Sequence, residues 1–352
     1  MSYRNVVLAG LGHHLPARVI SSTEIEDRIG ATLAKLRIPR GQLAAMTGIV
    51  ERRWWDFGET LSAAAGAAAS RAIEQGGVNP RSIGALIYAG VCREQLEPAT
   101  ACMVADWVGV SAGAQVYDIS NACLGVMNGI LQVANLIELG QIDSGLVCSA
   151  ETAQQIVELT IARLNAEPTM ENFKTALATL TGGSGAGAVL LSRRSEDDRR
   201  PRLVAAAVRQ ASEHHRLCRW GPDTGHPASA PMYMETHAID VLEHGVKLGV
   251  ETWGELMAGL SQQPAARSSA GVIDKTVCHQ VGSANRDAIL RALRLSPERD
   301  VVTYSQLGNM GTASLPVSAS LAADQGFFER GDRVAWLGIG SGLNCLMLGW
   351  DW

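Results

Sequence analysis

The feature that most constrains this chain is an internal repeat, because one segment of the first half resembles one segment of the second half. Residues 121–151 read NACLGVMNGILQVANLIELGQIDSGLVCSAE, and residues 309–342 read NMGTASLPVSASLAADQGFFERGDRVAWLGIGSG. Each segment begins with Asn, small residues and a glycine, continues as a helix rich in Ala and Leu, and ends in an apolar strand. A chance resemblance between two common βα units is the alternative. A duplication explains the pattern more simply and predicts two similar halves.

The remaining sequence alternates between strand and helix patterns, which is typical of an α/β fold. In the first half we predict strands at Asn5–Leu11, Ala85–Val91, Gln115–Ile119, Ser144–Ser149 and Gly185–Ser192, with helices at Thr60–Gln75 and Leu124–Leu139. The second half repeats the theme with Arg202–Arg209, a long helix around Tyr233–Gly259, Asp274–His279, Asn285–Leu295, Val301–Tyr304, Ser314–Gln325, Arg333–Ile339 and Leu343–Trp350.

A charged stretch with a proline, EDDRRPRL at 196–203, is the best candidate for a linker between the halves. We therefore expect an N-terminal half at 1–195 and a C-terminal half at 196–352. Residues from about 152 to 181 have mostly helical character and form an expected insertion in the first half.

Composition excludes several classes of protein. The 352 residues are 47% hydrophobic and 18% charged, with a net charge of −5, so nothing attracts the whole chain to nucleic acid or anionic lipid. The first apolar run is interrupted by His13, His14 and Pro16, and fits neither a signal peptide nor a membrane span. Seven scattered cysteines without a C-x-x-C pair suit a reducing cytoplasm, and no Cys/His spacing predicts a metal site.

Cys123 is the first candidate for chemistry because it lies between a strand, QVYDIS, and the start of a helix. The unpaired N–H groups and dipole of a helix N-terminus stabilise a thiolate, so we expect a lowered thiol pKa and a nucleophilic cysteine. The alternative is a small buried apolar residue, which describes most free cysteines.

His279 and Asn309 are the second and third candidates. His279 closes an apolar strand, and Asn309 opens the turn that the repeat pairs with the Cys123 turn, so all three residues should face one cavity. A Cys–His–Asn set can transfer an acyl group through a thioester intermediate, and the imidazole and amide N–H groups can hold the thioester oxygen. A strand-end histidine and a turn asparagine are the alternatives. The glycine-rich segments 183–188 and 338–342 run into strands, which excludes dinucleotide loops.

These motifs resemble the thiolase superfamily, and within it the ketoacyl-acyl-carrier-protein synthase III branch, from one end of the chain to the other. The matching pieces are LGHHLP, TGIVERRW, NACLGVMNG, GSGAGAVLL, CHQ, GNMGTAS and GIGSGLN. The resemblance implies a thiolase fold, a duplicated αβαβα architecture of five layers. It implies that Cys123, His279 and Asn309 are catalytic, with a backbone N–H of Ser341 beside the cysteine. It also implies a homodimer that needs no cofactor beyond its coenzyme A or phosphopantetheine thioester substrates.

Glu97, in CREQLEPATA, departs from the ordinary synthase III pattern. Those enzymes carry a bulky apolar residue here and form their carbanion by decarboxylating a malonyl group. LEPAT, TIARL, LCR and GIGSGLNC instead resemble the OleA-type acyl-CoA condensing enzymes, and 3-hydroxy-3-methylglutaryl-CoA synthases use a glutamate similarly. In the OleA-type enzymes the glutamate crosses the dimer interface, where burial could raise its pKa enough to remove an α-proton. The alternative is a surface acid at the start of the helix after Pro98.

The resemblance therefore implies an acyltransferase that joins two fatty acyl-CoA thioesters by non-decarboxylative Claisen condensation. Decarboxylative synthesis from a malonyl carrier protein, acyl transfer to an alcohol or amine, and a non-catalytic acyl-binding protein stay open. An acyl carrier protein is the alternative acyl donor. The usual ligand-binding arginine after the HQ motif is displaced here to Arg286, and Arg53 follows TGI, so both are candidates for binding the substrate.

Overall fold

The computed structural model describes residues 1–221, 233–263 and 273–352. Within these residues nine strands form a mixed sheet in the order β11-β12-β13-β8-β1-β7-β6-β4-β5. Those of the first half are β1 (Val6–His14), β4 (Ala85–Ala89), β5 (Gln115–Ile119), β6 (Ser144–Glu151) and β7 (Gly185–Arg193). Those of the second half are β8 (Arg202–Gln210), β11 (Lys275–Cys278), β12 (Arg333–Gly340) and β13 (Asn344–Asp351).

The pairing of these strands repeats between the halves. In the first half β7 runs antiparallel to β1 and β6, and β6 is parallel to β4. In the second half β13 runs antiparallel to β8 and β12, and β12 is parallel to β11. The two half-sheets meet along β1 and β8, near the pair Val7 and Arg202. This repeated order confirms the predicted duplication into two pseudo-symmetric halves.

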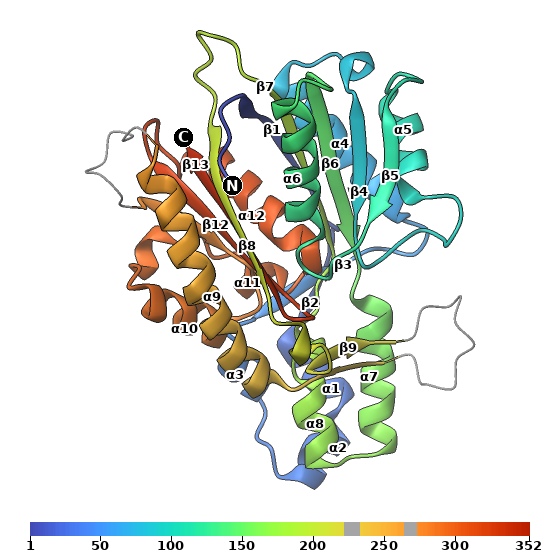
Figure 1. Ribbon diagram of the computed structural model, residues 1–352. Helices are drawn as coiled ribbons and strands as arrows, with labels where there is room; N and C mark the ends of the chain where they lie inside the picture. The colour runs from blue at the N-terminus through green and yellow to red at the C-terminus, as the bar shows by residue number, and fades with distance from the viewer. Residues whose placement is uncertain (222–232, 264–272) are drawn as a thin grey trace.

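The helices and the two half-sheets stack in five layers, as predicted (Figure 1). The outer helices of the first half are α4 (Leu61–Gly76) and α5 (Thr100–Val108), and those of the second are α9 (Ala238–Ser261) and α10 (Ser283–Leu293). The two helices of the repeat, α6 (Gly125–Glu138) and α12 (Ser314–Asp324), share one apolar cluster with inward-facing residues of both half-sheets. Separate clusters join α4 and α5 to the first half-sheet and α9 and α10 to the second. The central helices are thus enclosed between the half-sheets.

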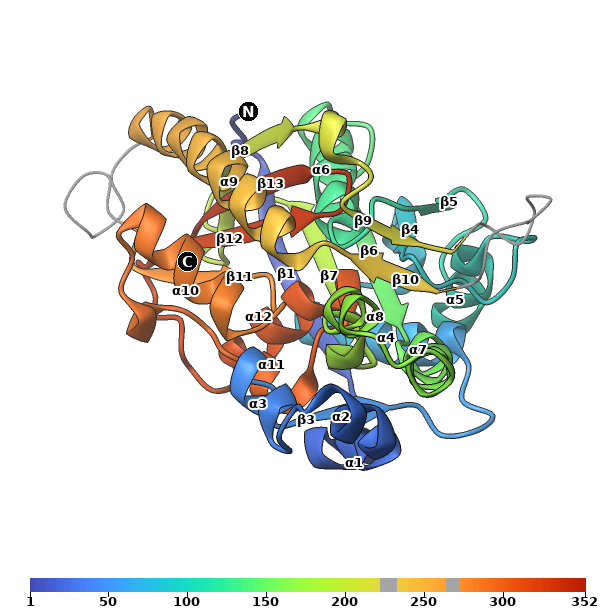
Figure 2. The same ribbon diagram turned by 90° about the horizontal axis from the view of Figure 1, so that it is seen from below.

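Smaller elements lie together at one end of these layers, which Figure 2 views from below. They are α1 (Ser22–Arg28), α2 (Gly30–Leu36), α3 (Gln42–Thr47), α7 (Gln154–Ala166), α8 (Met170–Ala176) and the hairpin of β2 (Arg18–Ser21) and β3 (Glu51–Trp54). Their apolar side chains form a cluster of their own. Because α7 follows directly after β6, this group lies beside the carboxyl ends of the first half's parallel strands. The limits of the two halves remain a prediction.

The long helix of the second half begins later than the sequence pattern predicted. It starts at Ala238 instead of near Tyr233, because β10 (Met234–Thr236) pairs with β9 (Cys218–Trp220) in a short antiparallel ribbon. The residues of β10 directly precede the helix, and the sequence pattern does not separate them from its first turn. The difference matters because Cys218 and Met234, on the two strands of the ribbon, line the candidate site.

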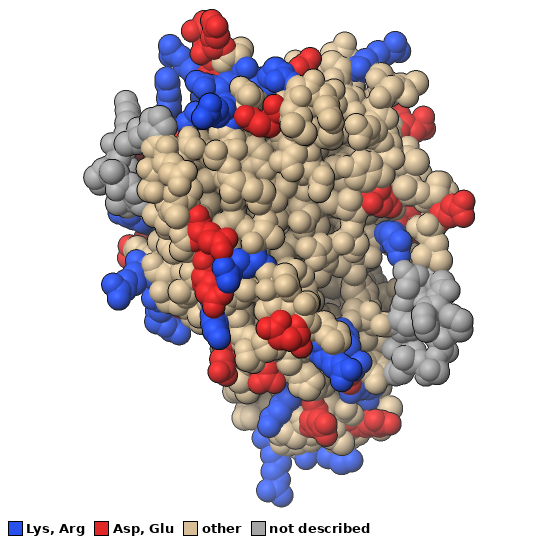
Figure 3. Space-filling view, viewed as in Figure 1, with Lys and Arg blue, Asp and Glu red and all other residues tan. Residues whose placement is uncertain are grey.

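Charges of both signs cluster where residues 194–201 join β7 to β8, and the middle of this face has few charges (Figure 3). Acidic side chains along α9 include Glu251 and Glu255, which pair with Arg209. Among the described residues, no helix is long and apolar enough to cross a membrane.

Close packing of α4 on β1 makes the first prediction. A Cβ atom added to Gly12 would lie 2.0 Å from the carbonyl oxygen of Ala68, so the helix would have to move. We expect Gly12→Ala to lower the free energy of unfolding by about 2 kcal/mol or more. Gly30→Ala is the matched control, because nothing lies within 4 Å of its added Cβ. Denaturant unfolding measures both, and equal stability of the two variants would contradict the close approach.

Candidate active site

Cys123 lies on the turn between β5 and α6, two residues before the helix begins. The turn is tight: the Leu124 N–H donates to the carbonyl of Asn121 at 2.9 Å, and Ala122 has a φ of 45°. The first turn of α6 is tied to the second half, since the Val126 N–H donates to Thr312 Oγ1 at 2.8 Å. The structure therefore places Cys123 at the helix start, as the sequence indicated.

His279 follows β11 and is only 7% exposed. Its backbone N–H donates to the carbonyl of Leu337 at 2.9 Å, which fixes the main chain. Neither ring nitrogen has a hydrogen-bond partner in the described chain, although both are buried. Burial lowers the pKa of His279 to about 4, so the ring is neutral at physiological pH. A neutral imidazole has one donor and one acceptor, and both are available to a bound molecule.

Asn309 precedes the 3₁₀ turn Gly311–Ala313, at the start of the second repeat helix. Its backbone N–H donates to the carbonyl of Thr181 at 3.0 Å, and its own carbonyl accepts from the Gly183 N–H at 2.9 Å. Its side-chain oxygen accepts the Gly311 N–H at 3.0 Å. The amide NH₂ is therefore the end of this side chain that can donate to a ligand.

Two cavities meet at these residues. The first has a volume of about 130 Å³ and extends between β12, α9 and α10, and His279 lines it. The second has a volume of about 310 Å³ and extends toward β6 and α7. The residues common to both are Cys123, Ala178, Cys218, Met234, Asn309 and Ser341. The nucleophile candidate thus lies where two separate spaces join, which would let it contact two acyl groups in turn.

The expectation of a lowered pKa for the Cys123 thiol is wrong in this structure. Burial raises the pKa of Cys123 to about 12, and the backbone N–H of the same residue opposes that shift without overcoming it. Desolvation of a thiolate in an apolar cavity outweighs the stabilisation from the helix start. Because His279 is neutral, it adds no positive charge to the cavity that it lines together with Cys123. The free protein should therefore hold a protonated thiol.

This protonation state can be tested by alkylation. The rate of iodoacetamide modification of Cys123 should rise about tenfold per pH unit between about pH 7 and about pH 9, because the thiolate fraction grows tenfold per unit below the pKa. Mass spectrometry of the Cys123 peptide measures the rate, with Cys123→Ser as the blank and the exposed Cys102 as an internal standard. A plateau in the Cys123 rate before about pH 8 would instead indicate a stabilised thiolate.

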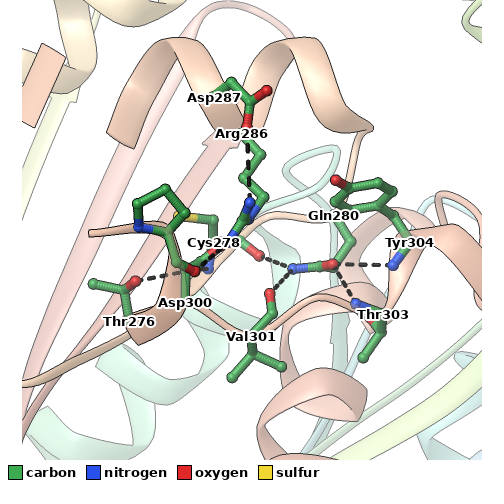
Figure 4. Close-up of polar contacts among 10 residues, drawn as sticks. Thr276, Cys278, Gln280, Arg286, Asp287, Asp300, Val301, Thr303 and Tyr304 are labelled. Atoms are coloured by element: carbon green, nitrogen blue, oxygen red, sulfur yellow. Dashed lines mark hydrogen bonds and ion pairs between the residues drawn. The ribbon is translucent and has the colours of Figure 1, made fainter. Parts of the chain in front are cut away.

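A buried polar network holds the chain on both sides of His279 (Figure 4). The Gln280 side chain donates to the carbonyls of Cys278 and Val301 at 2.7 and 3.1 Å. Its oxygen accepts the N–H groups of Thr303 and Tyr304 at 2.8 and 3.1 Å. The strand that ends at the histidine is thereby fastened to the segment that leads into α11 (Tyr304–Leu307) and on to Asn309. Gln280 thus links the two side chains proposed to hold the thioester oxygen.

Arg286 belongs to the same network. Its Nε donates to Asp300 at 2.7 Å, and Asp300 accepts the Cys278 N–H at 3.2 Å and the Thr276 hydroxyl at 2.9 Å. Burial raises the pKa of Asp300, and the guanidinium opposes that shift. Arg286 does line the first cavity, but its side chain is 12% exposed and already paired. Arg286 thus supports the chain around His279, and its binding of substrate stays a prediction.

The substitution Gln280→Glu tests whether this network stabilises the fold and positions the catalytic candidates. A glutamate keeps the shape but cannot donate to the two carbonyls, and it buries a charge. We expect a loss of about 2–4 kcal/mol in unfolding free energy and slower acylation of Cys123. Denaturant unfolding and mass spectrometry of the acylated protein measure these, with the exposed Gln155→Glu as control. An unchanged acylation rate would exclude a positioning role for Gln280.

Glu97 and Arg53 lie apart from the cavities of the described chain. Glu97 is exposed and lines neither cavity, so within one chain it does not meet Cys123. This agrees with a role in a second subunit but does not test it. Arg53 lines neither cavity, and its guanidinium donates to the carbonyl of Pro16 at 3.2 Å. Nothing in its placement supports the predicted contact with substrate.

Sequence reasoning missed Glu151, which lines the second cavity. It is the last residue of β6 and is 4% exposed. Burial raises its pKa to about 7, although backbone N–H groups of Val91, Cys92 and Thr312 favour the ionised form. A carboxylate directly after an uninterrupted buried strand was the available signal, because such a residue must find partners inside the protein.

Two comparisons of sequence agree with this geometry. Residues 117–211 match the model for 3-oxoacyl-[acyl-carrier-protein] synthase III, and residues 265–352 match that for its C-terminal part. The chain is 49% identical over its whole length, and that of the relative, to an acyl-CoA:acyl-CoA alkyltransferase of Shewanella oneidensis. It is 34% identical to an enzyme of the same name from Xanthomonas campestris, covering 99% of this chain and 98% of that one.

Solved structures of Xanthomonas campestris OleA match the fold with a TM-score of 0.91 at 34% identity, covering 100% of this chain and 98% of that one. Another, with bound lauric acid and lauroyl-CoA, matches with a TM-score of 0.90. Variants of that protein with a cysteine, a glutamate or a histidine replaced are also among them. The replaced glutamate precedes the replaced cysteine by the same number of positions that separates Glu97 from Cys123.

Fold and site together define a condensing enzyme of the thiolase fold. The chain belongs to the 3-oxoacyl-[acyl-carrier-protein] synthase III family and, within it, to the OleA group of acyl-CoA:acyl-CoA alkyltransferases.

Proposed function

We propose that this chain joins two fatty acyl-CoA thioesters by a non-decarboxylative Claisen condensation, with Cys123 as the acyl carrier. The observation that carries the proposal is that Cys123, His279 and Asn309 line one cavity. The names of the relatives support acyl-CoA as both substrates, and the lauroyl-CoA bound to OleA supports a long acyl chain. The product is a 3-oxoacyl thioester with an α-alkyl branch.

The first half-reaction loads the cysteine. The sulfur of Cys123 attacks the thioester carbonyl and the bond to coenzyme A breaks, while the thiol proton passes to the departing coenzyme A sulfur through the neutral ring of His279. Donors for the developing oxyanion are the imidazole, the Asn309 amide and the backbone N–H groups near Cys123 and Ser341. The raised pKa of the thiol means that proton removal must accompany attack.

The second half-reaction forms the carbon–carbon bond. A second acyl-CoA enters, and Glu97 of the partner subunit removes a proton from its α-carbon. The carbanion attacks the acyl-Cys123 carbonyl, the carbon–sulfur bond breaks, and the proton held by the glutamate returns to the sulfur. Exposure of Glu97 on the single chain supports this arrangement, because an acid that acts in a second subunit must project from its own.

The proposed protein is a homodimer that uses no cofactor, since the thioesters supply all the reacting atoms. Its proposed setting is the cytoplasm, where a reducing environment keeps thiols free. The cysteines of this chain are unpaired.

Product analysis with a fatty acyl-CoA as the sole substrate tests the proposal. Wild type should give acylated Cys123 and a 3-oxo product from two acyl-CoAs. Cys123→Ala should give neither, and Glu97→Gln should still acylate but condense at least about 100-fold more slowly. The exposed Glu196→Gln is the control. Mass spectrometry of protein and products follows both half-reactions.

The alternatives predict different results. Condensation that appears only when a malonyl thioester is added would replace the proposal with the decarboxylative reaction. A product without a new carbon–carbon bond after an alcohol or amine is added would indicate simple acyl transfer. Acyl groups on a carrier protein, tested beside the coenzyme A thioesters, decide which donor the site uses.

A further inference from the structure

Glu151 is a buried acid in the nucleophile's cavity that the proposed mechanism does not use. It lines the second cavity together with Cys123 and Asn309. Its carboxylate oxygens accept the backbone N–H groups of Val91 and Cys92 at 2.9 and 3.1 Å. Its own carbonyl accepts the indole N–H of Trp55 at 3.0 Å. Both the main chain and the carboxylate of Glu151 are thus held in position.

The two N–H groups that Glu151 binds belong to Val91 and Cys92, which begin the loop segment that carries Glu97. We call these two residues the root of the segment. Further contacts lie at this root: the Tyr88 hydroxyl is 2.8 Å from the carbonyl of Cys92 and 2.7 Å from that of Ala150, and the Cys92 thiol donates to the carbonyl of Thr152 at 3.3 Å. Residues 95–98, by contrast, are exposed. The segment therefore has a fixed root, held by a residue of the cavity wall, and an exposed tip with Glu97 on it.

The opposite side of the carboxyl group meets the turn of Asn309. A Cβ atom on Gly311 would lie 3.4 Å from the carboxyl carbon of Glu151, and the N–H of Thr312 favours the ionised carboxylate. Thr312 also accepts the Val126 N–H in the first turn of α6. The Glu151 carboxylate therefore contacts both the root of the Glu97 segment and the turn that follows Asn309, and Thr312 links that turn to α6.

We infer that Glu151 is a positioning residue: it fixes the root of the Glu97 segment and so sets where Glu97 meets the second acyl thioester in the partner subunit. The inference rests on the proposed function, because it assigns Glu97 to the partner's site. A buried carboxylate suits this task because both its oxygens accept, and two backbone N–H groups point at it.

If Glu151 positions the segment, the condensation rate should depend on the protonation of its carboxyl group. Burial raises its pKa to about 7, so the acid protonates as the pH falls through that value. A protonated carboxyl keeps one acceptor but turns an O–H toward a backbone N–H, which loosens the root. The titratable groups that face it are Cys92, Tyr88 and Cys123. Condensation should weaken below about pH 7 in wild type, while Cys123 acylation does not follow the same curve.

Glu151→Gln tests this directly, since its NH₂ group would oppose one of the two N–H donors. We expect a condensation kcat at least about tenfold lower, a clearly smaller loss in the rate of Cys123 acylation, and no titration near pH 7. Tyr88→Phe removes the hydroxyl that lies between the carbonyls of Cys92 and Ala150 but keeps the Glu151 carboxylate, so it should show a smaller loss, mainly in condensation. Glu243→Gln, an exposed change on α9, is the control. Equal loss of acylation and condensation in both variants would overturn the inference.

Mixed dimers separate a positioning role from direct chemistry. A dimer of one Glu151→Gln subunit and one Cys123→Ala subunit has one intact cysteine, and that cysteine is served by an undisturbed Glu97 segment. Condensation at about half the wild-type rate is expected. A rate as low as that of the Glu151→Gln homodimer would mean that Glu151 acts in its own cavity, and the inference would fail.

A second pairing, Cys123→Ala with Glu97→Ala, tests the underlying arrangement alone. Recovery of condensation in this mixed dimer supports the reach of Glu97 across the interface. Absence of recovery overturns that part of the proposed function and, with it, the inferred action of Glu151 on the partner's site. The two failures are therefore distinguishable.

Discussion

The site depends on the enclosure of α6 and α12 between the two half-sheets. Both helices start at the same end of the core, and the hydrogen bond from the Val126 N–H to Thr312 joins the first turn of α6 to the 3₁₀ turn that leads into α12. Cys123 and Asn309 precede these turns. The packing of the two helices therefore sets the distance and orientation between these two side chains. Helices rich in small residues allow this approach, because interiors are close-packed and leave little room for adjustment.

The sequence predicted the architecture and the centre of the site well. The repeat of Asn121–Glu151 at 309–342 predicted that the turns of Cys123 and Asn309 would face each other, and strand patterning placed His279 at a buried strand end. Patterns of this kind succeed because hydrophobic periodicity reports which face of an element is buried. The same periodicity placed the start of α9 too early, since the three residues of β10 are too few to show a strand pattern of their own.

Burial and long-range contacts could not be read from local patterns. The helix position of Cys123 indicated a lowered pKa, but desolvation in the folded cavity reverses the direction. The contact of Arg286 with Asp300, which lies fourteen residues further on, likewise depends on the folded chain and not on the HQ motif. The partners of Glu151, the N–H groups of Val91 and Cys92, lie 60 and 59 residues earlier in the chain, so no local pattern shows them.

The protonated state of the Cys123 sulfur also bears on how long the protein lasts in the cell. Peroxides oxidise thiolates much faster than thiols, so a sulfur that stays protonated until an acyl thioester arrives is poorly reactive toward them. Burial thus protects the residue between catalytic cycles. In this view the apolar wall of the cavity serves the acyl chain and also preserves the empty site from oxidative inactivation.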